Sequence, residues 1–484
     1  MHHHKHHSST LWKYRLHQRL WEQAYPLWID DEGILPAASL WHCIRTNVQI
    51  LRAYSISSGD RILIALPQQR SYIAWLLAGL WEGCSVALAA PSSDTDMLSE
   101  LLDVRLVIHS DGLTTRPQTR FPPTPDICLF LASSGSTGQP RWIALSVHNI
   151  FSVLDSHIPA LQLADMARLD TQYPAARVLS LLPLHHAFGL IIDFFTAFFC
   201  GAEIIRDSYS GRDVAHILYL ARYYNITHCS MVPLLAKRLQ AIPEGQAFLK
   251  CLQGGVIGGA PVDAELARVL SNTQLRAGYG QTEASPGITL GDPGIWYAGY
   301  IGSAQGCTTR LSFRGTLEFF GANLALGEWT NAGLVRYDAC AWRDTGDYAQ
   351  ESPYLNAPGY IFIGRTDDTF KLANGRHVPA PHWEQILKTN IPYCCDAIIT
   401  THDGVTCSVG LLVEASPNDI NHCALRAIIC EVLAISPSIL GTVRCFTSEQ
   451  WHYTAKGQSD RQALHQILGT PAPQITECGN MYNV

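Results

Sequence analysis

Short runs of consecutive apolar residues alternate with longer amphipathic segments through the first half of the chain. "RILIAL" at residues 61–66 precedes "SYIAWLLAGLWEG", "ARVLSLLP" at 176–183 precedes "LIIDFFTAFFCG", and "ITHCSMV" at 226–232 precedes "PLLAKRLQAI". Apolar runs of this length are typical of strands buried on both faces, and the segments between them have helical periodicity. The alternation predicts an α/β fold of parallel sheets covered by helices.

The pattern changes after residue 302. "RLSFRGTLEFFG" at 310–321 has shorter alternating runs with glycine turns, which predicts a smaller β-rich lobe. After Gly364 a new alternation begins with "AIITTHD", "VGLLVEA" and the helical "ALRAIICEVLAI", which predicts a small separate α+β domain. We therefore expect a core domain over residues 21–363, a hinge at 364–368 and a C-terminal domain at 369–484. The opening "MHHHKHHSST" predicts a His-rich tail or expression tag, which we assign to residues 1–20.

Composition excludes several classes of protein. The chain has 484 residues, of which 15% are charged, and a formal net charge of −7, so neither nucleic acid nor an anionic membrane surface is an expected partner. Glu82, Asp193 and Glu203 interrupt the most apolar stretches, which leaves no run long enough for a membrane-spanning helix, and no signal peptide follows Met1. The 15 cysteines show no metal-binding spacing. A reducing, cytoplasmic location is expected.

A glycine- and hydroxyl-rich loop follows the apolar run 127–132. In "FLASSGSTGQPR", residues 130–141, such a loop offers backbone N–H groups and short hydroxyls to a polyphosphate. It does not match the P-loop pattern G-x-x-x-x-G-K-[ST]. Taken singly, it is equally compatible with a Ser/Gly surface loop.

Two further motifs carry carboxylates in glycine-rich surroundings. "AGYGQTEASPG" at 277–287 contains Glu283, which can hold Mg²⁺ through hard oxygen ligands, although a glutamate in a loop is more often solvated. "WRDTGDYA" at 342–349 contains Asp347, which can accept hydrogen bonds from both ribose hydroxyls or can simply form a turn.

Six motifs in order resemble the signature of the adenylate-forming superfamily, which includes acyl- and aryl-CoA synthetases, peptide-synthetase adenylation domains and firefly luciferase. They are "SSGSTGQPR", "LPLHHAFG", "YGQTE", "GTLEFFGANLALGEW", "DTGDYA" and "GRTDDTFKLANG", and the resemblance extends over roughly residues 40–468. It implies a large N-terminal domain of two α/β subdomains with a β-barrel lobe, and a small mobile α+β C-terminal domain that closes over the active site.

The resemblance also implies an ATP site. Thr282 and Glu283 would contact the α-phosphate and Mg²⁺, Tyr279 with Gly280 would lie near adenine, and Asp347 with Arg365 would hold the ribose. Arg141 stands where the family usually has lysine, which keeps the charge but changes the donor geometry. The residues that would cradle the β- and γ-phosphates are Ser134, Gly135, Ser136, Thr137 and Gly138, with Thr137 also a metal ligand.

For the acyl pocket, the resemblance implies that His186 stands at the mouth, with His185 in a position that is usually aromatic. A buried structural role for His186 is the alternative. Asp193 could pair a substrate amine or hydroxyl, or be a satisfied, partly buried carboxylate. The pocket residues implied are Phe188, Ile192, Asp193, Val232, Gly258, Gly259 and Gly278. Asp367 matches the hinge about which the small domain rotates, a solvated linker being the alternative.

The segment "YTAKGQSDR", residues 453–461, matches the motif that delivers the family's catalytic lysine. Alignment on Thr454, Gly457 and Arg461 places Gln458 at the usual lysine position. Lys456, two residues earlier, fits the K-G-T-x-x-R arrangement of a subset of the family. We therefore predict Lys456 as the catalytic cation, and a solvent-exposed loop lysine is the alternative.

These implications define an expected activity. A carboxylic acid would attack ATP to give an acyl- or aryl-adenylate and pyrophosphate, and a thiol of CoA or of a carrier-protein phosphopantetheine would then displace AMP. ATP, Mg²⁺ and CoA or phosphopantetheine are the expected cofactors, and a separate acyl carrier protein is a possible partner. The main alternative is a degenerate homologue that binds nucleotide or acyl ligand without adenylation; a luciferase-type oxidation has no support in the sequence.

Overall fold

The computed structural model describes residues 7–21, 26–117, 120–133, 140–163, 176–354, 358–368, 370–414, 417, 420–453 and 459–469. The chain forms two compact units, Met1–Thr345 with Ala349–Phe362, and Gly346–Tyr348 with Ile363–Val484. The predicted mixed α/β fold with a large N-terminal and a small C-terminal domain is confirmed. The predicted hinge, residues 364–368, belongs to the second unit.

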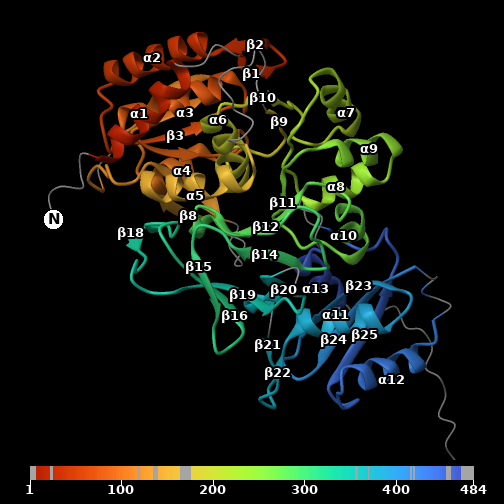
Figure 1. The fold of residues 1–484 in the computed structure, drawn as a ribbon. Helices are drawn as coiled ribbons and strands as arrows, with labels where there is room; N and C mark the ends of the chain where they lie inside the picture. Colours follow the sequence, from red (N-terminus) through yellow and green to blue (C-terminus); the bar gives the residue numbers. More distant parts are fainter. Residues whose placement is uncertain are drawn as a thin grey trace, which may run out of the picture. The chain divides into compact units, whose positions relative to one another are not determined.

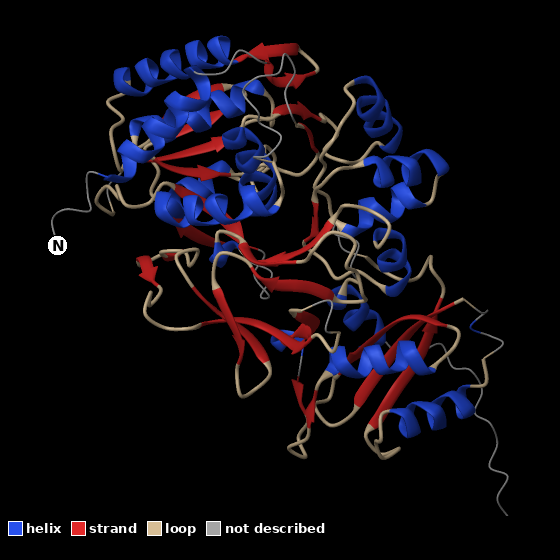
Figure 2. Cartoon of the chain, in the orientation of Figure 1, coloured by secondary structure: helices blue, strands red, loops and turns tan. Residues whose placement is uncertain are grey.

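The first sheet has eight strands in the order β18-β17-β8-β7-β4-β3-β5-β6, and its centre, β7-β4-β3-β5, is parallel. Ile62 and Ile64 face a cluster that includes α1, α2, α3 and α5, whereas Leu63 and Ala65 face α4 and Trp329. Helices therefore cover both faces, as Figures 1 and 2 show for this sheet. The strands are β3 (Arg61–Ala65), β4 (Ser85–Leu88), β5 (Leu106–His109), β6 (Gly112–Thr115), β7 (Leu129–Ser133), β8 (Arg141–Leu145), β17 (Gly327–Thr330) and β18 (Gly333–Arg336), and the helices are α1 (His7–Trp21), α2 (Ala37–Ala53), α3 (Arg70–Glu82), α4 (Thr95–Leu102) and α5 (Val147–Ala160).

The second sheet, β2-β1-β10-β9, is parallel across β1, β10 and β9. Ile205 and Leu179 pack on one face with α7 to α10, and Ile204 and Val178 pack on the other in the cluster that also holds α6. Its elements are β1 (Pro26–Asp30), β2 (Gly33–Pro36), β9 (Arg177–Ser180), β10 (Glu203–Arg206), the π-helix η1 (Phe188–Phe195), α6 (Thr196–Cys200), α7 (Val214–Tyr223), α8 (Pro233–Gln240), α9 (Pro243–Cys251) and α10 (Ala264–Leu270).

The third sheet runs β11-β12-β13-β14-β20-β19-β16-β15. Only β11 and β12 pair in parallel among its first four strands, and antiparallel pairing begins at β13, so the short strands expected after residue 302 lie at the antiparallel end. The strands are β11 (Val256–Gly258), β12 (Arg276–Gly280), β13 (Gly287–Leu290), β14 (Tyr300–Ala304), β15 (Thr308–Leu311), β16 (Thr316–Phe320), β19 (Arg343–Glu351) and β20 (Tyr360–Arg365), and the 3₁₀ turn η2 (Thr282–Ala284) follows β12.

The second unit is built on the sheet β23-β24-β25. Val409 and Leu411 of β24 pack with α11 and α12 on one face, while Leu412 packs with Leu464 of α13 on the other. The elements are η3 (Thr366–Asp368), β21 (Phe370–Lys371), β22 (His377–Val378), α11 (Ala380–Asn390), β23 (Cys394–Thr400), β24 (Cys407–Val413), α12 (His422–Val432), β25 (Leu440–Phe446) and α13 (Arg461–Gly469).

The prediction of a His-rich tail over residues 1–20 is wrong for residues 7–20, because these residues form most of α1. Trp12 and Leu16 are fully buried in the main core, and the Trp12 ring packs edge-on against Phe151 and Phe195 at centroid distances of 5.0 and 5.5 Å. The run of histidines concealed an amphipathic helix that begins next to it. No helix in the described ranges combines the length and apolar character needed to cross a membrane.

Candidate active site

The turn after β12 positions Glu283. A Cβ at Gly280 would lie 1.7 Å from the carbonyl oxygen of Pro286, so only glycine allows this close approach, and the Gln281 N–H donates to the same oxygen at 3.0 Å. The Ala325 N–H then donates to the Glu283 carbonyl at 2.9 Å. The backbone of Glu283 is thus fixed on both sides, and its side chain is held in one direction.

The Glu283 side chain is buried, so the solvated-loop alternative does not hold. Its Oε1 accepts from Arg141 Nη2 at 2.5 Å and from Ser133 Oγ at 3.3 Å. Ser133 ends β7 and Arg141 begins β8, and the two residues face each other in the antiparallel register of these strands. The sheet therefore brings both ends of the glycine-rich loop to the carboxylate.

The second oxygen of this carboxylate, Oε2, is buried and has no hydrogen-bond partner among the described residues. A buried carboxylate oxygen without a partner is costly, and a hard cation such as Mg²⁺ is one group that would satisfy it. Arg141 keeps 39% of its side chain exposed and lies 3.8 Å from Glu328 through Nη1. The cluster thus offers one carboxylate oxygen and one accessible guanidinium at the ends of the loop.

Several predicted residues lie outside the described part of the chain. They are the phosphate-loop residues Ser134, Gly135, Ser136, Thr137 and Gly138, and Lys456 with Gln458 in the C-terminal motif. The ends of the C-terminal loop are described, however. Tyr453 and Ser459 pair across an isolated antiparallel bridge, and Arg461 donates to both oxygens of Glu384 at 2.7 and 2.8 Å. The segment that carries Lys456 is therefore anchored at both ends to the second unit.

Asp347 and Arg365, which the resemblance assigns to the ribose, lie together in the second unit. Arg365 Nε is 3.4 Å from Asp347 Oδ1, and Arg365 Nη2 is 3.8 Å from Asp367 Oδ2. Asp367 itself is exposed in the 3₁₀ turn η3. The pairing supports a shared role for the two predicted ribose residues, while Asp367 as hinge stays a prediction.

The predicted acyl-pocket glycines are in contact with one another and with Phe188. A Cβ on Gly258 would lie 2.8 Å from the Gly278 carbonyl oxygen and 3.6 Å from Phe188 Cζ, and one on Gly259 would lie 3.8 Å from Val232 Cγ1. Glycine at 258 and 278 allows β11 and β12 to pack closely, since a Cβ at Gly278 would lie 2.3 Å from Val256 Cγ1, whereas Gly259 has room for a side chain beside Val232. Tyr279, the next residue of β12, packs against the apolar clusters around Ile288 and Ile301.

His185 and His186 stand between β9 and η1 with their ring centroids 4.4 Å apart. His186 is exposed, so it is not a buried structural histidine. His185 is half-buried and its Nδ1 contacts Gln68 Nε2. Burial, then the neighbouring His186 and Arg206, lowers the pKa of His185 to about 4, so this ring is neutral at pH 7.

Asp193 departs from its predicted state as a satisfied, partly buried carboxylate. It lies in η1 with Ile192, is only 2% exposed, and neither of its oxygens makes a hydrogen bond of good geometry within the described residues. Burial raises its pKa to about 7, against the opposing effect of Ser180, Arg206 and Ser230. The carboxylate lies inside the protein because η1 is buried on all sides from Gly189 to Phe195.

Two residues of the site were missed by sequence interpretation. Arg206 ends β10, is buried, and donates to the carbonyls of Leu182 and Ser180 at 2.8 and 3.2 Å. Gln68, in the loop after β3, joins Arg206 to His185. An arginine ending the strand-like run "EIIR" is a signal that could have been noticed, because charged groups are rarely buried without a partner. Gln68 carries no comparable signal.

Comparison with known proteins finds AMP-binding enzymes and acyl-CoA ligases. The family model of AMP-binding enzymes matches residues 89–310. A feruloyl-CoA synthase from Amycolatopsis sp is 28% identical over 356 residues, which cover 65% of this chain and 70% of the relative. The segment 89–310 is thus similar to the AMP-binding domain of adenylate-forming enzymes. Acyl-CoA ligase sidI from Aspergillus fumigatus is also 28% identical, over 261 residues that span 48% of this chain and 42% of the relative.

Solved structures share the fold of this protein over nearly the whole chain. ATP-bound MatB from Rhodopseudomonas palustris superposes with a TM-score of 0.74 at 17% identity, covering 94% of this chain and 98% of the other. The O-succinylbenzoate coenzyme A synthetase of Bacillus subtilis gives 0.70 at 16% identity, covering 93% and 97%. At this identity the likeness concerns the fold alone.

Proposed function

We propose that this protein activates a carboxylic acid with ATP, forming an acyl- or aryl-adenylate and pyrophosphate, and then transfers the acyl group to a thiol. The observation that carries the proposal is the buried Glu283 carboxylate, which joins Ser133 and Arg141 at the two ends of the glycine-rich loop and keeps Oε2 without a partner. The relatives named as acyl-CoA ligases and feruloyl-CoA synthase support the same reaction.

Each polar group would have a distinct task. Glu283, through Oε2, and Thr137 would hold Mg²⁺, which supplies positive charge beside the phosphates when bound. The hydroxyl of Thr282 and the guanidinium of Arg141 would orient the phosphates, since positioning and charge stabilisation supply most of the catalysis in reactions at phosphorus. Tyr279 with Gly280 would border adenine, and Asp347 with Arg365 would hold the ribose.

The C-terminal motif would supply the remaining cation. Lys456 would approach the reacting carboxylate and the α-phosphate, with the loop anchored at Tyr453, Ser459 and Arg461. Rotation of the second unit about Asp367 would then exchange the groups presented to the adenylate for those needed in thiol transfer.

A few chemical classes are candidates for the substrate acid and for the thiol acceptor. The room beside Gly259, where an added Cβ would lie 3.8 Å from Val232 Cγ1, favours an aryl ring or a medium-length chain. CoA is the acceptor we favour, because the relatives are named as CoA ligases, and a phosphopantetheine on a separate carrier protein is the other candidate. The cysteines of the described ranges are all free, which supports action in the reducing cytoplasm.

A second candidate function, ligand binding without adenylation, is favoured by one observation: Gln458 stands where most of the family has the catalytic lysine. ATP–pyrophosphate exchange with a panel of aryl and medium-chain acids separates the two functions. We expect exchange by the wild-type protein and its loss, by about a thousandfold, in Lys456→Ala, because a cation beside a developing oxyanion is removed. Transfer to CoA from a supplied acyl-adenylate should survive in that variant. Exchange that is unchanged in Lys456→Ala would assign the role to another group.

A further inference from the structure

A hydrogen-bonded chain runs from the buried Arg206 through Gln68 to His185. Arg206 Nη2 donates to Gln68 Oε1 at 3.0 Å, and Gln68 Nε2 contacts His185 Nδ1. Arg206 lies at the carboxyl end of β10, Gln68 follows β3 and His185 follows β9. Three strands from two sheets thus bring their carboxyl ends together at one histidine, and in open α/β sheets these ends are where ligands bind.

The orientation of the Gln68 amide follows from its neighbours. Its Oε1 also faces the Leu184 N–H at 2.8 Å, and both the Leu184 amide and the Arg206 guanidinium can only donate. The atom facing them must therefore be the carbonyl oxygen. Gln68 Nε2 then has to donate to His185, which leaves His185 Nδ1 without a proton and places the proton of the neutral ring on Nε2.

Neutrality of this ring is reinforced by its surroundings. The buried guanidinium of Arg206 and the adjacent His186 both disfavour a positive charge on His185. The ring is half-buried, and Nδ1 is the nitrogen that contacts Gln68. His185 thus presents an N–H donor of fixed tautomer to whatever enters beside His186 and Phe188.

We propose that His185 is a further substrate-contacting residue, an inference that rests on the proposed function. Its Nε2–H donates a hydrogen bond to an oxygen of the carboxylic acid. Gln68 and Arg206 are positioning residues. A neutral donor stabilises the carboxyl oxygen by a hydrogen bond alone. A cationic donor would form a strong ion pair, and the ion pair would make the carboxylate a weaker nucleophile.

The tautomer can be measured without any activity. Nitrogen-15 NMR of histidine-labelled protein, with the His185 signals identified by their loss in His185→Phe, should show an unprotonated Nδ1 and a protonated Nε2. Gln68→Glu replaces the donor by a carboxylate that only accepts, so the proton should move to Nδ1. Gln240→Leu, which removes an exposed glutamine bonded to Glu265, is the matched control and should leave the signals unchanged. A protonated Nδ1 in the wild type, or no change in Gln68→Glu, would overturn the assignment.

Substrate contact is tested by ATP–pyrophosphate exchange with the acid that the wild type uses best, starting from benzoate and octanoate. His185→Phe should raise KM for the acid about tenfold or more, with KM for ATP unchanged, and His185→Gln, which keeps a donor, should recover part of the loss. An unchanged KM for the acid in His185→Phe, with the wild type active, would overturn this inference alone. No exchange by folded wild-type protein would instead overturn the proposed function, and this inference with it.

Discussion

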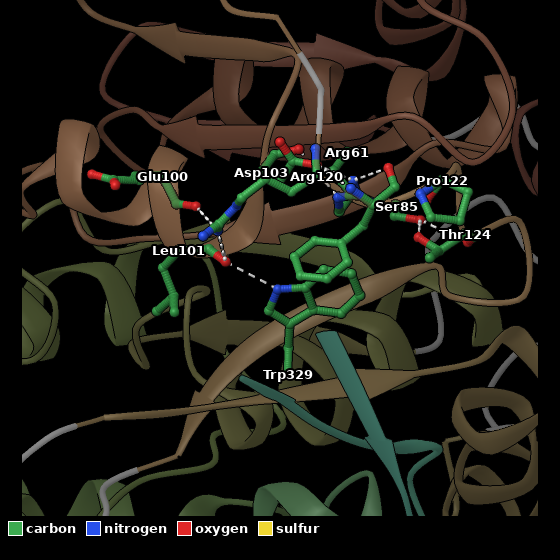
Figure 3. Close-up of polar contacts among 10 residues, drawn as sticks. Arg61, Ser85, Glu100, Leu101, Asp103, Arg120, Pro122, Thr124 and Trp329 are labelled. Carbon is green, nitrogen blue, oxygen red and sulfur yellow. Dashed lines mark hydrogen bonds and ion pairs between the residues drawn. The ribbon is translucent and has the colours of Figure 1, made fainter. Parts of the chain in front are cut away.

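Two buried arginines lie at opposite ends of parallel strands, and they differ in their ion pairs and hydrogen bonds. Arg61 begins β3, and its guanidinium pairs with Asp103 at 2.8 Å, donates to the carbonyls of Pro122 and Phe121, and lies over the Trp329 ring (Figure 3). Arg206 ends β10 and has no ion pair within the described residues. Its Nε and both oxygens of the nearby Asp193 are buried without hydrogen-bond partners.

The two clusters differ in whether residues of the chain itself pair and hydrogen-bond all of the buried charged groups. A buried charge destabilises the folded state unless it is paired and hydrogen-bonded, so the Arg61 cluster is finished by the chain itself. Figure 3 shows further bonds around it, from Trp329 Nε1 to the Leu101 carbonyl at 3.1 Å and from Ser85 Oγ to the Thr124 carbonyl at 2.9 Å. In the cluster at the other end, Arg206 Nε and both Asp193 oxygens have no hydrogen-bond partner among the described residues. We therefore interpret Arg61, whose charge is fully paired and hydrogen-bonded, as a structural residue, and Arg206, whose surroundings keep unpaired polar atoms, as a residue of the proposed site.

The largest expected effect is at the structural end. Asp103→Asn removes the charge that pairs with Arg61 and should lower the free energy of unfolding by about 3 kcal/mol, because the arginine is left buried without a counterion. Urea unfolding followed by tryptophan fluorescence measures this. Asp126→Asn, which breaks the exposed pair with Arg336, is the matched control and should change stability by about 0.5 kcal/mol or less. Equal losses in the two variants would remove the distinction on which the comparison depends.

At the proposed nucleotide site around Glu283, a substitution is expected to lower catalytic activity. Glu283→Gln keeps the shape of the side chain but removes the charge that holds Arg141 and would hold Mg²⁺, so exchange should fall about a hundredfold per folded molecule. Glu328→Gln is the control, because that carboxylate lies 3.8 Å from Arg141, at the limit of an ion pair. It should retain activity within about threefold. A Glu283→Gln variant as active as Glu328→Gln would contradict the assignment of the nucleotide site.

A smaller effect is expected from Asp193 and depends on pH. Its pKa is raised to about 7 in the folded protein, so the folded state holds a proton that the unfolded chain releases near pH 4. That contribution to stability is complete below the unfolded pKa and is lost as pH rises through 7. Between pH 5.5 and 8.5 the wild type should therefore lose about 2 kcal/mol that Asp193→Asn does not lose. Parallel pH profiles of unfolding for the two proteins would contradict a buried, protonated Asp193.

The sequence predicted those features that depend on local pattern. The strands β3 and β9 were evident because they are runs of apolar residues buried on both faces, and Glu283 could be singled out because its motif is contiguous. Helix α1 was missed because the histidines that precede it dominate the composition, while its apolar residues Trp12, Leu16 and Leu20 are spaced at a helical interval.

What the sequence could not predict depends on contacts between distant residues. Arg141 and Glu283 are 142 positions apart, and Gln68 and Arg206 are 138 apart. These pairs meet only through the strand order and register of the sheets. Periodicity records which face of a strand is buried, but it does not record which strand ends lie side by side, so the pairing of Gln68 with Arg206 could not be recognised.

The central claim is that the site around the buried Glu283 activates a carboxylic acid. ATP–pyrophosphate exchange on wild type, Asp103→Asn and Glu283→Gln, compared at equal folded concentration, tests it most directly. We predict exchange by the wild type with at least one aryl or medium-chain acid, its retention in Asp103→Asn, and its loss in Glu283→Gln. No exchange with any acid, in folded wild-type protein that still binds ATP, would contradict the account.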